Sequence, residues 1–153
     1  MPRYATVSLV GQTVTEAVAH GKHLLIRTGR GLTVHTHLKM EGAWRIEPAG
    51  GRPLRDSHRL RLLLANSNWV AAGYQLGITE VLPTAREDQV TGHLGPDLLG
   101  KDWDPVAAAA RLARDPDRPI GEALLDQRNL AGLGTVYMAE TLFLRGVDPS
   151  RPA

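Results

Sequence analysis

Short apolar-rich runs, separated by turn residues, fill the first half of the chain. The breaks at 29–31, 48–51 and 66–68 have the Gly, Pro and Asn content of hairpin turns. Short strands at such intervals are typical of an antiparallel sandwich or barrel. We therefore expect strands at residues 13–19, 23–28, 32–38, 43–47, 59–65, 69–72 and 77–82.

The pattern changes to helices in the second half. Residues 104–113 form an alanine-rich run in which Asp104 is placed to cap a helix and Pro105 fits its first position. Gly146 follows the last helical pattern and should end it. Further helices are expected at about residues 89–93, 120–125 and 134–144.

A run of strands followed by a run of helices indicates an α+β protein, because a parallel sheet would need the two to alternate. We predict an antiparallel β-sandwich domain over residues 1–83 and a helical domain over residues 84–153.

Composition excludes several classes of protein. The chain has 153 residues with 42% hydrophobic content, which is enough for a sizeable core. It has no cysteine, which excludes a disulfide framework and a thiolate zinc site and suits the cytoplasm. No stretch approaches the roughly 18 apolar residues of a membrane helix, so we expect a soluble protein with no membrane partner.

Charge is unevenly distributed along the chain. The net charge is +2, but residues 1–82 carry 10 Lys/Arg against 5 Asp/Glu, and residues 83–153 carry 8 against 11. A basic half suits a polyanion such as nucleic acid. An ordinary basic surface would have the same charge count, so charge alone does not decide.

A glycine-containing connection joins the last two helical patterns. Gly132 and Gly134 lie where the final helix begins, so the backbone there can approach a ligand and the free N–H groups can bind a phosphate. A dinucleotide-binding loop is disfavoured because this connection follows a helix rather than a strand. A helix hairpin with capping glycines is the structural alternative.

The whole run around these glycines is more informative than the glycines alone. The stretch "LLDQRNLAGLGTVYMAETLFLRGVDP" closely resembles the helix-two-turn-helix motif of the formamidopyrimidine-DNA glycosylase and endonuclease VIII family, here at about 120–145. Upstream, "HGKHLLIR", "LTVHTHLKMEGAWRI" and "HLGPDLL" resemble that family's core strands and linker in the same order. The segments "GKHLL" and "GAWRI" favour the endonuclease VIII branch.

This resemblance implies an enzyme of base-excision repair. Such a DNA glycosylase and abasic-site lyase flips oxidised bases out of double-stranded DNA, without a small-molecule cofactor. The implied location is a bacterial-type cytoplasm, with the protein on the nucleoid when bound.

The resemblance also implies roles for individual residues. Lys22 matches the strand lysine beside the reacting sugar and phosphate, where a fixed cation assists β-elimination. Met40 matches the residue inserted into the duplex, and Lys39 a neighbouring DNA contact. Without the family, Lys22 is a surface lysine at a strand end and Met40 is a core methionine.

Further DNA-binding positions lie in the second half. His93 stands where an arginine commonly contacts phosphate, and Thr135 stands where an asparagine binds the same backbone. A neutral histidine has less positive charge and a threonine a shorter reach, so we expect weaker or rearranged phosphate contacts. Tyr137 and Glu140 are interpreted as structural or secondary. The remaining implied DNA-binding residues are Arg128, Gly132 and Gly134.

Two strand histidines raise the question of a metal. His35 and His37 alternate along one strand and share a face. No third ligand is evident, so a histidine in a hydrogen-bond network is the better interpretation and no metal site is predicted.

Family members cleave with an N-terminal Pro-Glu pair whose proline amine forms a Schiff base with the sugar. Here Pro2 is followed by Arg3 and aligns with an internal position, although Pro2 itself stays an alternative nucleophile. We expect a chain truncated at both ends and inactive as it stands, with exposed apolar surface and an unpaired sheet edge.

The C-terminal finger that holds zinc in some family members would also lie outside the chain, so no cofactor is expected here. The alternatives to a fragment of the enzyme are a non-catalytic remnant that binds damaged DNA and a product that folds poorly and does nothing.

Overall fold

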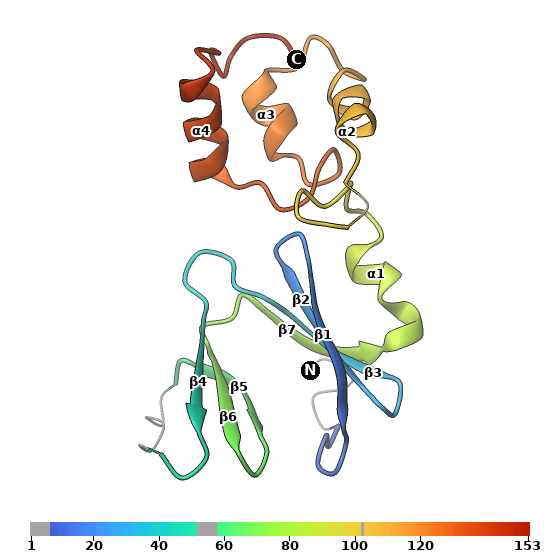
Figure 1. The fold of residues 1–153 in the computed structure, drawn as a ribbon, viewed down its shortest axis with the longest axis vertical. Coiled ribbons are helices and arrows are strands. Elements are labelled where there is room, and N and C mark those ends of the chain that lie inside the picture. Colours follow the sequence, from blue (N-terminus) through green and yellow to red (C-terminus); the bar gives the residue numbers. More distant parts are fainter. Residues whose placement is uncertain (1–6, 52–57, 102) are drawn as a thin grey trace. The chain divides into compact units, whose positions relative to one another are not determined.

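A computed structural model describes residues 7–51, 58–101 and 103–153 of the chain. The chain forms two compact units, whose elements are labelled in Figure 1. The first comprises Met1–Val18 and His23–Ala85, and the second comprises Ala19–Lys22 and Arg86–Ala153. The short segment 19–22 groups with the helices because its backbone bonds to their loops, a long-range relationship that the sequence pattern did not indicate.

The first unit contains a four-stranded sheet in the order β1-β2-β3-β7. The β3 strand pairs antiparallel with both β2 and β7 and is buried at its centre, where Thr33, Val34, His35 and Thr36 are at most 1% exposed. Leu25 and Leu82 on the flanking strands complete this part of the core. The strands are β1 (Val14–His20), β2 (His23–Thr28), β3 (Leu32–His37) and β7 (Ile78–Pro83).

A second, three-stranded sheet has the order β4-β6-β5, all antiparallel. Its strands are β4 (Ala43–Pro48), β5 (Leu60–Ala65) and β6 (Trp69–Tyr74). Val34 of the first sheet and Leu62 and Leu64 of the second line a cavity of about 750 Å³, so the two sheets are incompletely packed there. The predicted sandwich is therefore present.

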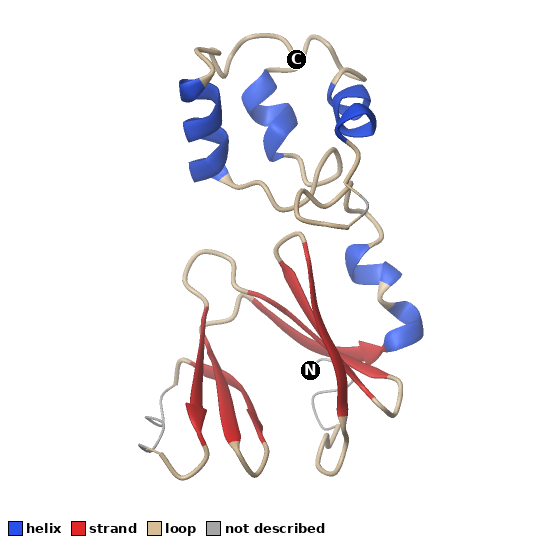
Figure 2. Cartoon of the chain, in the orientation of Figure 1, coloured by secondary structure: helices blue, strands red, loops and turns tan. Residues whose placement is uncertain are grey.

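The helical unit follows a short 3₁₀ turn, Thr84–Arg86 (Figure 2). Its helices are α1 (Asp88–Thr91), α2 (Pro105–Leu112), α3 (Ile120–Leu125) and α4 (Thr135–Leu144). Small residues dominate its core and allow close packing, with Ala108, Ala123 and Ala131 at most 4% exposed. Within the described residues, no helix is long and apolar enough to cross a membrane.

Local signals placed the start of α2 and the end of α4 correctly, whereas α1 was expected at residues 89–93 and spans Asp88–Thr91. The Asp104 carboxylate accepts hydrogen bonds from the N–H groups of Val106 (2.8 Å) and Ala107 (3.1 Å), which confirms the predicted cap of α2. Gly146, at φ +61°, follows α4 as predicted. The α+β fold class is confirmed, with strands first and helices second. The strand β6 is longer than expected and reaches Tyr74, because it pairs with a strand on each side.

Candidate functional site

The β1–β2 turn, Ala19–Lys22, lies closely against the loop before α4. Gly21 has φ +56°, and a Cβ there would lie 3.0 Å from the Ala131 Cβ and 3.2 Å from the Gly132 nitrogen. Glycine suits both this backbone conformation and the narrow space, and any larger residue would be strained here. The Gly21 N–H donates a 2.7 Å hydrogen bond to the Asp97 carboxylate, so the turn is fixed in the second unit.

This turn brings the Lys22 ammonium to the beginning of α4. Its Nζ donates a 2.7 Å hydrogen bond to the Leu133 carbonyl, which also accepts from the Gln127 amide at 2.9 Å. A Cβ on Gly134 would lie 3.6 Å from Nζ, so the ammonium lies over the residue that precedes the helix. Lys22 is therefore held in place by contacts with the helical unit.

The start of α4 can attract an anion. Gly132 has φ +102°, and the N-cap Gly134 is extended at φ −123°. The first-turn N–H groups of a helix have no partners within the helix, and no side chain of the described residues caps them here. Thr135 begins the helix and is exposed. A cation and a helix N-terminus thus meet at one place, and both favour negative charge.

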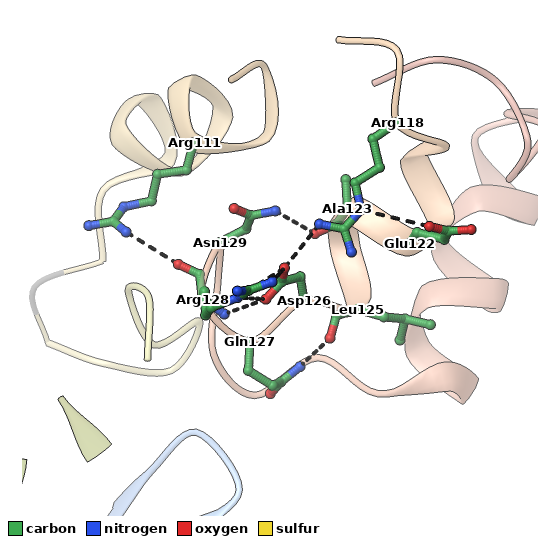
Figure 3. A network of polar contacts seen from close by, with 9 residues as sticks. All are labelled: Arg111, Arg118, Glu122, Ala123, Leu125, Asp126, Gln127, Arg128 and Asn129. Atoms are coloured by element: carbon green, nitrogen blue, oxygen red, sulfur yellow. Dashed lines mark hydrogen bonds and ion pairs between the residues drawn. The ribbon is translucent and has the colours of Figure 1, made fainter. Parts of the chain in front are cut away.

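The loop between α3 and α4 is organised by Asp126 (Figure 3). Its carboxylate accepts hydrogen bonds from Arg128 Nη2 at 2.7 Å and Arg118 Nη1 at 3.0 Å. The hydrogen bond from Arg128 holds the pKa of Asp126 well below its usual range, and Asp126 raises the pKa of Arg128 in turn. Arg128 therefore presents a guanidinium whose side chain is 72% exposed but already ion-paired.

The same loop is also held by amide side chains, drawn in Figure 3. Asn129 Nδ2 donates to the Ala123 carbonyl at 3.0 Å, and Gln127 Nε2 donates to the Leu125 carbonyl at 2.9 Å. Gln127 Oε1 accepts from the Gly132 N–H at 3.1 Å, so one amide supports the loop on both sides. These bonds explain how a loop with little regular structure stays in one conformation.

Met40 stands on the turn between β3 and β4 in the first unit. It is 97% exposed, which contradicts the interpretation as a core methionine. The neighbouring Lys39 has φ +55°, and its N–H donates to His37 Nδ1 at 2.8 Å. A Cβ on Gly77 would lie 2.7 Å from the Lys39 Cβ, so the turn packs closely on the β6–β7 connection. A supported turn thus presents an apolar, unbranched side chain.

His35 lies in a hydrogen-bond network, as interpreted from the sequence. It is 1% exposed, and its two ring nitrogens lie 2.7 Å from His23 Nδ1 and 2.8 Å from the Glu80 carboxylate. The His23 ring also meets the His37 ring edge-on, with centroids 4.8 Å apart. Within the described ranges, no group of three or more His, Cys, Asp or Glu residues could hold a metal ion.

The structure brings some of the predicted residues together and not others. His93 lies in the α1–α2 connection and is exposed. Lys39 and Met40 belong to the first unit, and Pro2 and Arg3 lie outside the described residues. The residues gathered in the second unit around the start of α4 are Lys22, Gly132, Gly134 and Thr135, with Arg128 on the preceding loop.

Sequence reasoning missed two residues that support this arrangement. Asp97 and Gln127 both lie inside the stretches that carried the resemblance, "HLGPDLL" and "LLDQRN". Asp97 bonds to Gly21, which is distant in sequence. Gln127 bonds to Gly132 and Leu133, which lie in the irregular loop before α4. For Asp97 the available signal was a carboxylate inside a glycine- and leucine-containing segment, whereas Gln127 stands among other polar residues, Asp126, Arg128 and Asn129.

Two family models match the chain. Residues 2–74 match the formamidopyrimidine-DNA glycosylase N-terminal domain, and residues 94–153 match the formamidopyrimidine-DNA glycosylase H2TH domain. The first model covers strands β1 to β6, and the second covers helices α2 to α4.

Curated relatives match along almost the entire chain. A protein named probable endonuclease 8 2 from Streptomyces coelicolor is 52% identical over 99% of this chain and 55% of its own length. Endonuclease 8 2 from Mycobacterium tuberculosis is 51% identical over 99% of this chain and 60% of its own length. A protein named DNA-(apurinic or apyrimidinic site) lyase Nei2 from Mycolicibacterium smegmatis is 50% identical. The chain thus spans 55 to 60% of these relatives' length.

A solved structure shares the fold. The Lactococcus lactis formamidopyrimidine-DNA glycosylase, non-covalently bound to DNA containing an abasic site, superposes with a TM-score of 0.78 at 23% identity. The match covers 95% of this chain and 56% of that one.

Proposed function

Because the chain belongs to the formamidopyrimidine-DNA glycosylase and endonuclease VIII family, we propose that it carries the damaged-DNA-binding part of a base-excision repair enzyme. The proposed activity is that of a DNA glycosylase and abasic-site lyase acting on oxidised bases. Its partner is double-stranded DNA containing a damaged base or an abasic site. The endonuclease 8 names of the relatives support that branch of the family.

The observation that carries this proposal is the position of the Lys22 ammonium at the start of α4, 2.7 Å from the Leu133 carbonyl. A lysine, two close glycines and uncapped N–H groups together suit a phosphate. A phosphate held there would place the adjoining sugar close to a fixed cation. In the lyase step, such a cation would stabilise the charge that develops as the sugar–phosphate bond breaks.

Lys39 and Met40 suit a second part of the proposed function, which is to stabilise the DNA duplex after a nucleotide has been flipped out of it. Flipping a nucleotide leaves a gap in the base stack, and an exposed unbranched side chain can fill it. Met40, at 97% exposure, has the reach and the apolar surface for this role. We propose that Lys39 contacts the backbone of the opposite DNA strand. Further DNA phosphate contacts are proposed for Arg128, His93 and Thr135.

The first chemical step of the family uses an amine of the protein. A proline secondary amine attacks the sugar C1′, and the damaged base departs with the electrons of its bond to C1′. The amine then loses its proton and the C1′–O4′ bond opens, so that O4′ becomes a hydroxyl and an iminium joins the proline nitrogen to C1′. The described residues that carry the proposal, Lys22 and Met40, suit binding rather than attack on the sugar. They favour a second candidate function, in which the chain binds damaged DNA without cleaving it.

We further propose that this chain uses no cofactor. It has no cysteine, so its own residues do not fit a thiolate zinc site, and no step above depends on zinc. We place it in the cytoplasm, on the nucleoid when bound to DNA. The bacterial origin of its relatives supports that placement.

Borohydride trapping on duplex DNA with a single abasic site tests the enzyme proposal, because reduction makes an iminium permanent. A covalent adduct on the abasic duplex, and none on undamaged duplex, supports the glycosylase and lyase. Preferential binding of the abasic duplex without any adduct supports the non-catalytic alternative. Equal binding of both duplexes without an adduct would reject both.

A further inference from the structure

Asp97 uses both oxygens of its carboxylate on backbone N–H groups. Oδ2 accepts from the Gly21 N–H at 2.7 Å, and Oδ1 accepts from the Leu99 N–H at 3.0 Å. The second bond is local: an aspartate side chain that accepts from the N–H two residues later forms a small turn. The first bond joins residues 76 positions apart and is the one with a long-range consequence.

The backbone that carries Asp97 is itself fixed. Ala131 forms a parallel bridge with Asp97, in which its N–H donates to the Pro96 carbonyl at 2.8 Å and its carbonyl accepts from the Leu98 N–H at 3.1 Å. Ala131 is fully buried. The carboxylate therefore projects from a rigid base that is continuous with the loop before α4.

Gly21 directly precedes Lys22, so Asp97 fixes the point from which the lysine side chain extends. The far end of that side chain is held by the Leu133 carbonyl. A lysine side chain has several rotatable bonds, and holding it at both ends restricts where its charge lies. We infer that Asp97 is a positioning residue, which keeps the Lys22 ammonium at the start of α4 for a DNA phosphate.

This inference rests on the proposed function, since it assigns Lys22 to phosphate. It also explains why the residue is a carboxylate. Asparagine has the same shape but only one acceptor oxygen, so its NH₂ group would face the N–H of Gly21 or Leu99, donor against donor. Asp97→Asn therefore removes one of the two bonds with almost no change in volume.

The test is equilibrium binding of the whole chain to a duplex with a tetrahydrofuran abasic analogue, at several salt concentrations. Removing a negative charge should by itself strengthen binding to DNA. Positioning predicts the opposite for Asp97→Asn: about tenfold weaker binding, and a log K against log salt slope smaller by roughly 0.9, the value of one phosphate contact. Asp148→Asn is the matched control, because the exposed Asp148 carboxylate, among the described residues, accepts from Ser150 of its own turn.

A double-mutant cycle separates positioning from a general loss of structure. If Asp97 acts through Lys22, adding Asp97→Asn to Lys22→Ala should cost nothing further. Additive losses, or an Asp97→Asn variant that binds like Asp148→Asn, would overturn the inference. Asp97→Glu keeps two acceptor oxygens and should recover part of the affinity, and circular dichroism melts show that each variant is folded.

A measurement without DNA keeps this inference distinct from the proposed function. In the wild-type chain the Gly21 amide should exchange slowly with solvent, and isotope-labelled methylene groups of Lys22 should give an NMR signal typical of an ordered side chain. Both features should disappear in Asp97→Asn. Rapid exchange at Gly21 in the wild type would overturn the positioning role, whereas slow exchange without abasic-DNA binding would overturn the DNA function alone.

Discussion

The Lys22 ammonium donates a 2.7 Å hydrogen bond to the carbonyl of Leu133, a residue 111 positions away in the chain. The same carbonyl accepts from Gln127, so a cation and a loop amide share one acceptor immediately before α4. This relationship ties a turn between two strands to the start of a helix. The fold thereby brings Lys22, which the sequence alone also allows as an ordinary strand-end lysine, to the place where we propose that a DNA phosphate binds.

Lys22→Ala should weaken binding of an abasic duplex by at least about tenfold, because it removes one close phosphate partner. Lys22→Arg keeps the charge but not the shape of the ammonium, so we expect an intermediate loss. Fluorescence anisotropy on labelled duplexes measures both. Arg30→Ala removes the same charge from another exposed hairpin turn, and equal losses for Arg30→Ala and Lys22→Ala would contradict the role of Lys22.

Met40→Ala should reduce the preference for abasic over undamaged duplex by several-fold, with little effect on undamaged DNA. The reason is that a shorter side chain cannot fill the gap left by a missing base. Met40→Leu should retain most of the preference, and Lys39→Ala should weaken binding to both duplexes. Val10→Ala, at a site that is 88% exposed, is the control. An unchanged preference in Met40→Ala would exclude Met40 as the gap-filling residue.

Gly21→Ala should destabilise the chain more than Gly31→Ala. Both glycines have positive φ, +56° and +72°, so alanine is strained at either position. At Gly21 the new Cβ would also lie 3.0 Å from the Ala131 Cβ, whereas at Gly31 no atom of the part of the chain that the structure describes lies within 4 Å. We expect an extra cost of about 1–3 kcal/mol at Gly21, measured by urea unfolding. Equal costs would mean that the turn does not pack against the loop in solution.

Asp126→Asn should lower stability at neutral pH by about 1–3 kcal/mol, since it breaks a paired carboxylate that is 10% exposed. The hydrogen bond from Arg128 lowers the pKa of Asp126, so the charged form stabilises the fold. This contribution is complete above the ordinary value of 3.8 and is lost as the pH falls below it towards the lowered pKa.

The difference between wild type and Asp126→Asn should therefore shrink below about pH 4. Thermal melts from pH 2.5 to 7, with the exposed Asp117→Asn as control, measure it. A difference that stays constant across this range would show that the ion pair with Arg128 is not formed.

Sequence-based prediction succeeded where the signal was local. The strands follow from short apolar runs between Gly, Pro and Asn, and the start of α2 follows from Asp104 and Pro105. Gly132 and Gly134 indicated the start of α4, because glycines are typical of the turn before a helix. Each of these signals depends on backbone conformation or on hydrogen bonds within a few residues, which a sequence displays directly.

By itself, the sequence determined the α+β layout, the family and the residues that we propose for binding DNA. Only the tertiary structure decided that Met40 is exposed rather than buried, and that the exposed Lys22 bonds to the Leu133 carbonyl. It also revealed Asp97 as the partner of Gly21. Burial and long-range hydrogen bonds depend on which distant segments pack together, and no local pattern of polar and apolar residues specifies that pairing.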